Sequence, residues 1–125
     1  MKRIILLVDD SVTIHKIINF TFSNEEIEVV IADNGEQAIS KLKDMRPDLV
    51  LADVYLPKIN GYKVCQYIKS TPELNNIPVV LLVEAFEPFD QAAAMRIKAD
   101  GLLKKPFELK NLVDTVNQYL SKSNE

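Results

Sequence analysis

Residues 49–57 read LVLADVYLP, an apolar run that ends on one carboxylate, Asp53, and then breaks at a proline. A short apolar run of this kind is typical of a strand that is buried on both faces of a sheet. In open α/β sheets, ligands bind just beyond the carboxyl ends of the strands. The position of Asp53 therefore makes it a candidate reactive group, depending on what the rest of the chain brings beside it.

Apolar runs and amphipathic segments alternate along the whole chain. The predicted strands are residues 3–8, 26–31, 48–52, 77–83 and 101–104. Each strand is followed by a segment with helical spacing of apolar residues; the second helix is expected to reach Met45 and the fourth about Lys98. Strands that alternate with helices indicate a parallel sheet covered by helices on both faces. We therefore expect an α/β fold, a flavodoxin-like (βα)5 three-layer sandwich with the strand order 2-1-3-4-5.

The composition is that of one soluble globular domain. Of the 125 residues, 47% are hydrophobic and 26% are charged, which is too apolar for a disordered chain. The net charge of −3 provides no basic surface for nucleic acid or an anionic membrane, and no apolar run is long enough to span a bilayer. A single cysteine, Cys65, excludes an internal disulfide bond and fits a core position in a reducing compartment. We expect one cytoplasmic domain, residues 1–125.

Three acids follow two of the predicted strands: Asp9 and Asp10 end the first, and Asp53 ends the third. In the order 2-1-3-4-5 these strands are neighbours about 4.8 Å apart, so their terminal carboxylates share one small volume. Crowded carboxylates repel one another unless a cation or a proton intervenes. Mg²⁺ fits best, because it takes oxygen ligands and bridges readily to phosphoryl oxygen atoms. The alternative is that the acids only cap helices or face solvent.

Lys105 follows the fifth predicted strand and can supply a positive charge. Its long side chain can reach a phosphoryl oxygen beside the third strand, whereas Lys104 should point to the opposite face of the sheet. The alternative is a surface lysine before a turn. The bond to Pro106 is a candidate for a cis peptide, because proline reduces the preference for trans to about 0.5–1 kcal/mol.

Three segments carry a family resemblance. They are VDDS at residues 8–11, DLVLAD at 48–53 with Pro57 and Gly61 after it, and KPF at 105–107. Together they resemble the CheY-like receiver domain of bacterial two-component response regulators, over nearly the whole chain. This resemblance implies that Asp53 is a phospho-acceptor. It would be phosphorylated by the phosphohistidine of a histidine kinase, by a phosphotransfer protein or by a small phosphodonor.

The resemblance also implies a magnesium site. Asp10, Asp53 and the backbone carbonyl of Tyr55 would bind Mg²⁺ directly, with Asp9 nearby through water, and Lys105 would pair with the phosphoryl group. The carboxylate would attack in line while the metal and the lysine hold the charge on the transferring oxygen atoms. Such a domain is a substrate of phosphotransfer, so we expect no enzyme beyond this self-phosphotransfer.

Two positions depart from the family pattern. Receivers usually carry Ser or Thr at the end of the fourth strand, where this chain has Glu84. A carboxylate donates no hydrogen bond unless it is protonated, and it repels phosphoryl oxygen atoms. The switch aromatic, normally Tyr or Phe three residues before the lysine, is replaced by Leu102. In receivers the hydroxyl and the aromatic side chain are coupled during switching, and both of these groups are therefore absent here.

Three outcomes of the Glu84 substitution stay open. Glu84 turns outward and leaves phosphorylation intact with an atypical output, or it pairs with Lys105 and holds a constitutive conformation. In the third outcome the domain is a degenerate receiver, a phosphorylation-independent protein-interaction module. Because the three acids and the lysine are all retained, we favour phosphorylation of Asp53 with atypical switching.

The remaining notable side chains lie outside this set. Phe86 and Phe89 are expected in the local core, or else on an apolar surface near the fourth helix. The resemblance to receiver domains implies that a target, an output domain or a second copy of the chain would meet the face formed by helix 4, strand 5 and helix 5. His15 is expected to be an exposed helical residue without a chemical role.

Three other protein classes fit less well. A flavodoxin-type FMN protein needs a hydroxyl-rich phosphate loop after the first strand, where Asp9 and Asp10 would repel the phosphate. A P-loop NTPase is excluded because its glycine-rich motif is missing. A phosphatase with an aspartyl nucleophile needs a second acid two residues after Asp53, where Tyr55 stands.

Overall fold

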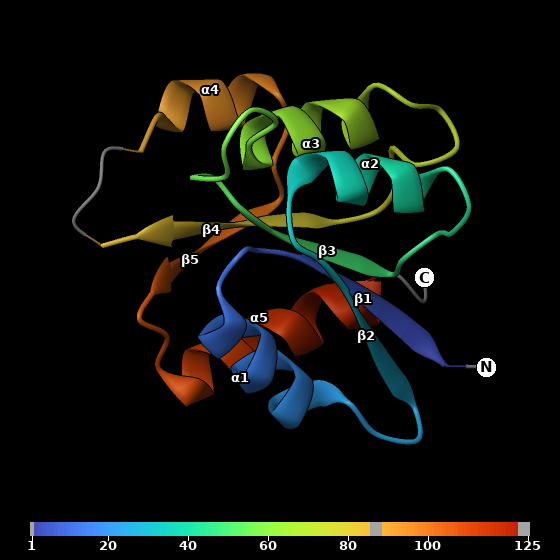
Figure 1. The fold of residues 1–125 in the computed structure, drawn as a ribbon, viewed down its shortest axis with the longest axis vertical. Coiled ribbons are helices and arrows are strands. Elements are labelled where there is room, and N and C mark those ends of the chain that lie inside the picture. The colour runs from blue at the N-terminus through green and yellow to red at the C-terminus, as the bar shows by residue number, and fades with distance from the viewer. Residues whose placement is uncertain (1, 86–88, 123–125) are drawn as a thin grey trace.

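The computed structural model describes residues 2–85 and 89–122, which form a five-stranded sheet between two layers of helices (Figure 1). The strands are β1 (Arg3–Val8), β2 (Ile27–Ala32), β3 (Leu49–Asp53), β4 (Val79–Glu84) and β5 (Gly101–Lys105). The helices are α1 (Val12–Phe22), α2 (Gly35–Leu42), α3 (Gly61–Lys69), α4 (Gln91–Arg96) and α5 (Leu109–Lys122). The strands are parallel in the order β2-β1-β3-β4-β5, which confirms the predicted flavodoxin-like topology.

The sheet separates two apolar cores. All five residues of β3 are buried, and alternate side chains enter opposite layers. Val50 and Ala52 join the core beneath α2, α3 and α4, whereas Leu49 and Leu51 join the core beneath α1 and α5 (Figure 1). A fully buried side chain of the size of leucine stabilises the fold by about 1.5–3 kcal/mol. β3 is therefore a rigid central strand, and its last residue, Asp53, has a fixed position.

Four helices begin at a polar side chain that caps them. In each of α1 to α4 the capping oxygen accepts a hydrogen bond from the backbone N–H three residues later; the caps are Ser11, Asn34, Asn60 and Asp90. Such a cap is worth about 1 kcal/mol relative to alanine. Two of the caps matter for the sheet edge, because Ser11 follows the acidic pair and Asn60 precedes the glycine that begins α3.

The observed elements differ from the predicted ones mainly at their ends. α2 ends at Leu42 and does not reach Met45. α4 ends at Arg96, and Lys98 has a left-handed backbone with φ of 64°, which a helix does not allow. β4 begins at Val79, two residues later than predicted, and extends to Glu84. In the part of the chain that the structure describes, no helix combines the length and the apolar character of a membrane span.

Candidate functional site

The three acids meet at the carboxyl edge of the sheet, where β1 pairs with β3. Val8 lies opposite Ala52 in this ladder, so Asp9 and Asp53 follow at the same level. One carboxylate oxygen from each of Asp9, Asp10 and Asp53 lies within 4.8 Å of the others. Asp9 and Asp53 are buried, whereas Asp10 is exposed. The cluster is therefore accessible from solvent on the side of Asp10.

Lys105 places a positive charge among these acids. Its ammonium donates hydrogen bonds to Oδ2 of Asp9 at 2.6 Å and to Oδ2 of Asp53 at 3.0 Å. Only 6% of Lys105 is exposed. Lys104, one residue earlier, is exposed, in agreement with the alternation of side chains along a strand. The Lys105–Pro106 peptide bond, a cis candidate from the sequence, is cis.

Burial and pairing act in opposite directions on the ionisation of this cluster. Burial alone would lower the pKa of Lys105, but its hydrogen bonds to Asp9 and Asp53 outweigh that effect and raise the pKa above its ordinary value. Burial raises the pKa of Asp9, and the hydrogen bonds from Lys105 and from the Ser11 N–H offset only part of this rise. Lys105 therefore stays charged at neutral pH and holds the neighbouring carboxylates together.

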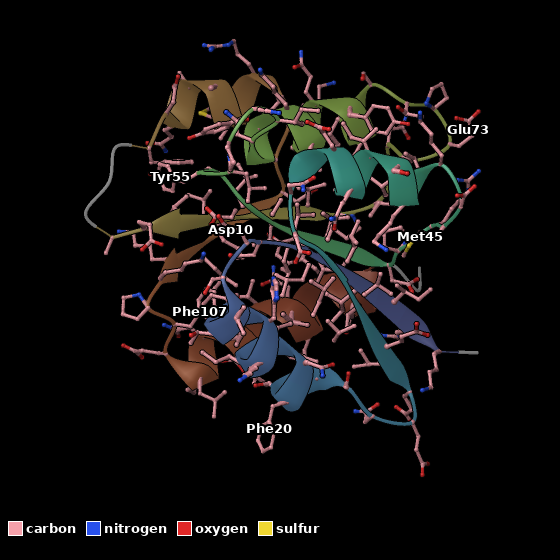
Figure 2. The ribbon with its side chains drawn as sticks, in the orientation of Figure 1. Asp10, Phe20, Met45, Tyr55, Glu73 and Phe107 are labelled. Atoms are coloured by element: carbon pink, nitrogen blue, oxygen red, sulfur yellow. The ribbon has the colours of Figure 1, made fainter. Side chains whose placement is uncertain are left out.

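Asp53 is fixed through both carboxylate oxygen atoms and through its backbone. Its Oδ1 accepts a hydrogen bond from the Tyr55 N–H at 2.9 Å, and its Oδ2 is bound by Lys105. A Cβ atom at Gly61 would lie 2.4 Å from the carbonyl oxygen of Asp53. α3 therefore starts in direct contact with the backbone of Asp53, and only glycine permits this approach. Tyr55 lies at the same end of the sheet as Asp10 (Figure 2).

An open pocket of about 320 Å³ connects these groups to solvent. The three acids, Lys105, Glu84 and the first turn of α1 line it. At about 30 Å³ per water molecule, the pocket accommodates a hydrated ion or a small tetrahedral anion. Carboxylate oxygen atoms are the ligands that hard divalent cations such as Mg²⁺ prefer.

A comparison with known families identifies this arrangement. The family model described as "Response regulator receiver domain" matches residues 5–117. The chain belongs to this family. Receiver domains are the phosphorylated modules of two-component systems, and Mg²⁺ and phosphoaspartate are typical of them.

Curated relatives of this receiver domain are longer proteins. The DNA-binding response regulator MtrA of Mycobacterium leprae is 30% identical over 125 residues, which are 100% of this chain and 54% of MtrA. The alkaline phosphatase synthesis transcriptional regulatory protein PhoP of Bacillus subtilis is 30% identical over 123 residues, which are 98% of this chain and 50% of PhoP. The chain therefore spans about half the length of these relatives.

Solved receiver structures superpose closely. A putative response regulator from Chloroflexus aurantiacus gives a TM-score of 0.87 at 29% identity, over 97% of this chain and 99% of that one. The chemotaxis response regulator CheY4 of Vibrio cholerae gives 0.85 at 25% identity, over 95% of this chain and 99% of that one.

Glu84 lines the acidic pocket of this receiver at the position that usually holds Ser or Thr. It lies opposite Lys105 in the β4–β5 ladder, so both side chains project from the same face of the sheet. Glu84 Oε1 is 4.0 Å from the Lys105 ammonium, at the limit of an ion pair, and 42% of the Glu84 side chain is exposed. Glu84 thus adds a negative charge at the rim, while Lys105 stays closer to Asp9 and Asp53.

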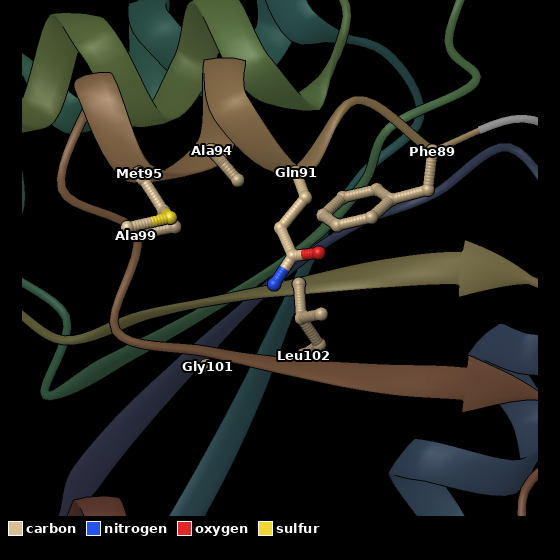
Figure 3. Close-up of a pocket in the computed structure, with 7 residues that line it drawn as sticks. All are labelled: Phe89, Gln91, Ala94, Met95, Ala99, Gly101 and Leu102. Carbon is tan, nitrogen blue, oxygen red and sulfur yellow. The ribbon is translucent and has the colours of Figure 1, made fainter.

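Leu102, at the position of the switch aromatic, lies beside a small cavity. It is 43% exposed, and it lines a cavity of about 120 Å³ between β5 and α4. In Figure 3 the side chains of Phe89 and Gln91 reach from the α4 side toward Leu102. A leucine has no ring to turn into this space, and the absence of an aromatic switch stays a prediction.

Phe89 brings an aromatic ring to the same region from the other side of the cavity. Its ring stacks on Tyr62 of α3, with ring centroids 6.0 Å apart, and it packs against the core. The Asp90 N–H donates a hydrogen bond to the Tyr62 hydroxyl at 3.0 Å. The core position expected for Phe89 is therefore confirmed, whereas Phe86 lies outside the described residues.

The exposure expected for His15 was wrong. Its side chain is only 14% exposed, and its Nε2 contacts the carbonyl oxygen of Asp9. Helical side chains lean toward the N-terminus of their helix, so His15, four residues after Ser11, turns back to the loop that carries the acids. Its position one turn from the cap was the signal in the sequence.

Proposed function

We propose that this receiver domain accepts one phosphoryl group on Asp53 from the phosphohistidine of a histidine kinase or of a phosphotransfer protein. The observation that carries the proposal is the Asp53 carboxylate in an acidic pocket, hydrogen-bonded by a buried lysine at 3.0 Å. The chain is modified in this reaction and turns over no separate substrate, so it acts as a signalling domain.

The chemistry follows from the groups in the pocket. A carboxylate oxygen of Asp53 attacks the phosphorus in line, the phosphorus–nitrogen bond to the donor imidazole breaks, and an acyl phosphate forms. The Lys105 ammonium already lies where charge develops on the phosphoryl oxygen atoms, so little reorganisation is needed during transfer. Gly61 leaves the backbone of Asp53 in the fixed contact that aims its side chain at the pocket.

Asp10, Asp53 and the carbonyl of Tyr55 are the proposed direct ligands of Mg²⁺, with Asp9 nearby through water. The close spacing of the three carboxylates and their oxygen donors support this assignment. When bound, Mg²⁺ supplies positive charge that offsets the repulsion between the acids and an incoming phosphoryl group.

Switching in this domain is proposed to be atypical. Glu84 offers a negative charge in place of a hydroxyl donor, and Leu102 offers no ring. The conformational signal of phosphorylation would then pass from Asp53 to the rest of the domain by a route other than the usual coupling of a hydroxyl to an aromatic side chain. The alternative is a degenerate receiver that binds partners without phosphorylation, which the 4.0 Å approach of Glu84 to Lys105 favours.

The proposed output surface is the face of α4, β5 and α5, for an output domain, a target protein or a second copy. Three of its large apolar side chains are exposed: Met95 by 72%, Leu102 by 43% and Leu109 by 64%. MtrA is named a DNA-binding response regulator and PhoP a transcriptional regulatory protein, and each is about twice as long as this chain. A cytoplasmic location fits a domain that receives its phosphoryl group from a histidine kinase.

Intact-mass spectrometry after incubation with acetyl phosphate and Mg²⁺ tests the proposal. We expect the mass of one added phosphoryl group on the wild-type domain and its absence when EDTA is present. If the wild type gains no mass while Glu84→Thr does, the degenerate receiver is the correct assignment. If neither protein gains mass, phosphoryl acceptance is wrong for this chain.

A further inference from the structure

Asp10 differs from the other two acids of the cluster in how it is held. Asp9 and Asp53 each accept hydrogen bonds from Lys105 and from a backbone N–H. Asp10 is exposed, and in the part of the chain that the structure describes its carboxylate has no hydrogen-bond or ion-pair partner. Among the described residues, the backbone at Asp10 is therefore what limits where its carboxylate can lie.

The backbone at Asp10 is held by His15. The carbonyl group of Asp9 belongs to the peptide unit that joins Asp9 to Asp10, and its oxygen is the atom that His15 Nε2 contacts. A peptide unit is planar, so a fixed carbonyl also fixes the N–H and the Cα atom of Asp10. On the other side of Asp9, its N–H donates to the Ala32 carbonyl at 3.1 Å.

The imidazole is itself held in place. Its side chain is 14% exposed within the first turns of α1, and its Nε2 lies 3.8 Å from Oδ1 of Asp33, which follows β2. Few conformations remain open to a ring buried to this extent, so its Nε2 is kept beside the carbonyl oxygen of Asp9.

We propose that His15 is a positioning residue of the magnesium site, which holds the Asp9–Asp10 peptide so that the Asp10 carboxylate faces the ion. This inference rests on the metal site of the proposed function and not on phosphoryl transfer. Groups that orient a metal ligand typically change metal affinity by about 10–100-fold when they are removed, and an exposed ligand such as Asp10 is expected at or below the lower end of this range. The alternative is that His15 only packs under α1 and contributes stability.

Two substitutions of similar size separate these roles. Glutamine carries an N–H donor at about the reach of Nε2, whereas the amide of asparagine ends at about the reach of Nδ1. His15→Gln should therefore keep the hydrogen bond to the Asp9 carbonyl, and His15→Asn and His15→Ala should lose it. Lys16→Ala, at an exposed neighbouring position of α1, is the matched control.

Calorimetric titration with MgCl₂, together with urea unfolding of each protein, tests the inference. We expect the Kd for Mg²⁺ to rise about threefold to tenfold in His15→Ala and His15→Asn, and to stay within about twofold of wild type in His15→Gln and Lys16→Ala. If His15→Ala fails to fold, the comparison of His15→Asn with His15→Gln decides.

Unchanged Kd values in His15→Ala and His15→Asn, even with lowered stability, would overturn the positioning role. An equal loss in His15→Gln would overturn it as well, because the donor would then not matter. A wild-type domain that binds no Mg²⁺ would remove the proposed metal site and this inference together, while the mass test of Asp53 would still report on phosphoryl acceptance.

Discussion

The ammonium of Lys105 lies 3.0 Å from Oδ2 of Asp53, although β4 separates the strands that carry the two residues. The same ammonium lies 2.6 Å from Oδ2 of Asp9, at the end of β1. Only a long side chain with its charge at the tip spans this distance along a sheet edge. The pocket thus contains a cation of the protein itself at the point where a phosphoryl group would need one.

Replacing Lys105 by methionine should destabilise the metal-free domain. Lys105→Met keeps the length of the side chain but leaves the carboxylates of Asp9 and Asp53 without their common partner. Breaking a buried pair from one side costs about 3–5 kcal/mol. We expect the free energy of unfolding in urea to fall by about 3 kcal/mol at pH 7 without Mg²⁺, whereas the exposed Lys104→Met should change it by less than about 0.5 kcal/mol.

The same pair of proteins should show a characteristic pH dependence. The pKa of Lys105 is raised above its ordinary 10.5 by its hydrogen bonds to the acids. A raised lysine pKa means that the folded state binds the proton more tightly than the unfolded state does. The stability difference between wild type and Lys105→Met should therefore be full from neutral pH up to about pH 10.5, where Asp9 and Asp53 are ionised, and shrink as the pH rises above 10.5. A difference that grows in that range would contradict the charged pair.

Glu84→Gln should make phosphorylation easier. The substitution removes a negative charge 4.0 Å from the Lys105 ammonium and adds an N–H donor. Because the side chain is partly exposed, screening leaves an effect of about 1 kcal/mol. We expect the acetyl phosphate concentration for half-maximal phosphorylation to fall about fivefold. Glu28→Gln, the same charge change at an exposed position of β2, should leave it unchanged, and an equal shift in both variants would refute the local effect.

Tyr62→Phe should loosen the start of α4. The change removes only the hydroxyl that accepts the hydrogen bond from the Asp90 N–H, and it leaves the ring stacked on Phe89. One such hydrogen bond is worth about 1 kcal/mol. We expect urea unfolding to show this loss, and Tyr67→Phe, in the same helix, to change stability by less than about 0.5 kcal/mol. Equal losses in the two variants would argue against the contact.

The sheet and the meeting of the acids could be predicted from the sequence for a physical reason. Short continuous apolar runs such as residues 49–53 are typical of strands buried on both faces, and right-handed crossovers between alternating strands and helices leave few strand orders to choose from. Once β1 and β3 are neighbours, Asp9 and Asp53 must lie at one edge. The orientation of Lys105 followed from alternation along β5.

The contacts of single side chains could not be predicted in the same way. Whether Glu84 approaches Lys105 depends on a side-chain rotamer at a strand end, where neighbouring residues constrain it little. His15 was assigned to solvent because it falls on the polar face of the predicted helix, and a helical pattern does not reveal that the first turn leans back over the loop. The early end of α4 depends on the left-handed backbone of Lys98, a conformation that residue type rarely indicates.

Chemical mapping of the modified residue tests the central claim most directly. Borohydride reduces an acyl phosphate to an alcohol, so a phosphorylated aspartate becomes homoserine and can be located by peptide mass spectrometry. After treatment with acetyl phosphate and Mg²⁺, we expect homoserine at position 53 of the wild type and at no position of Asp53→Asn. Homoserine at Asp9 or Asp10, or its absence from the wild type, would contradict the assignment of Asp53 as the phospho-acceptor.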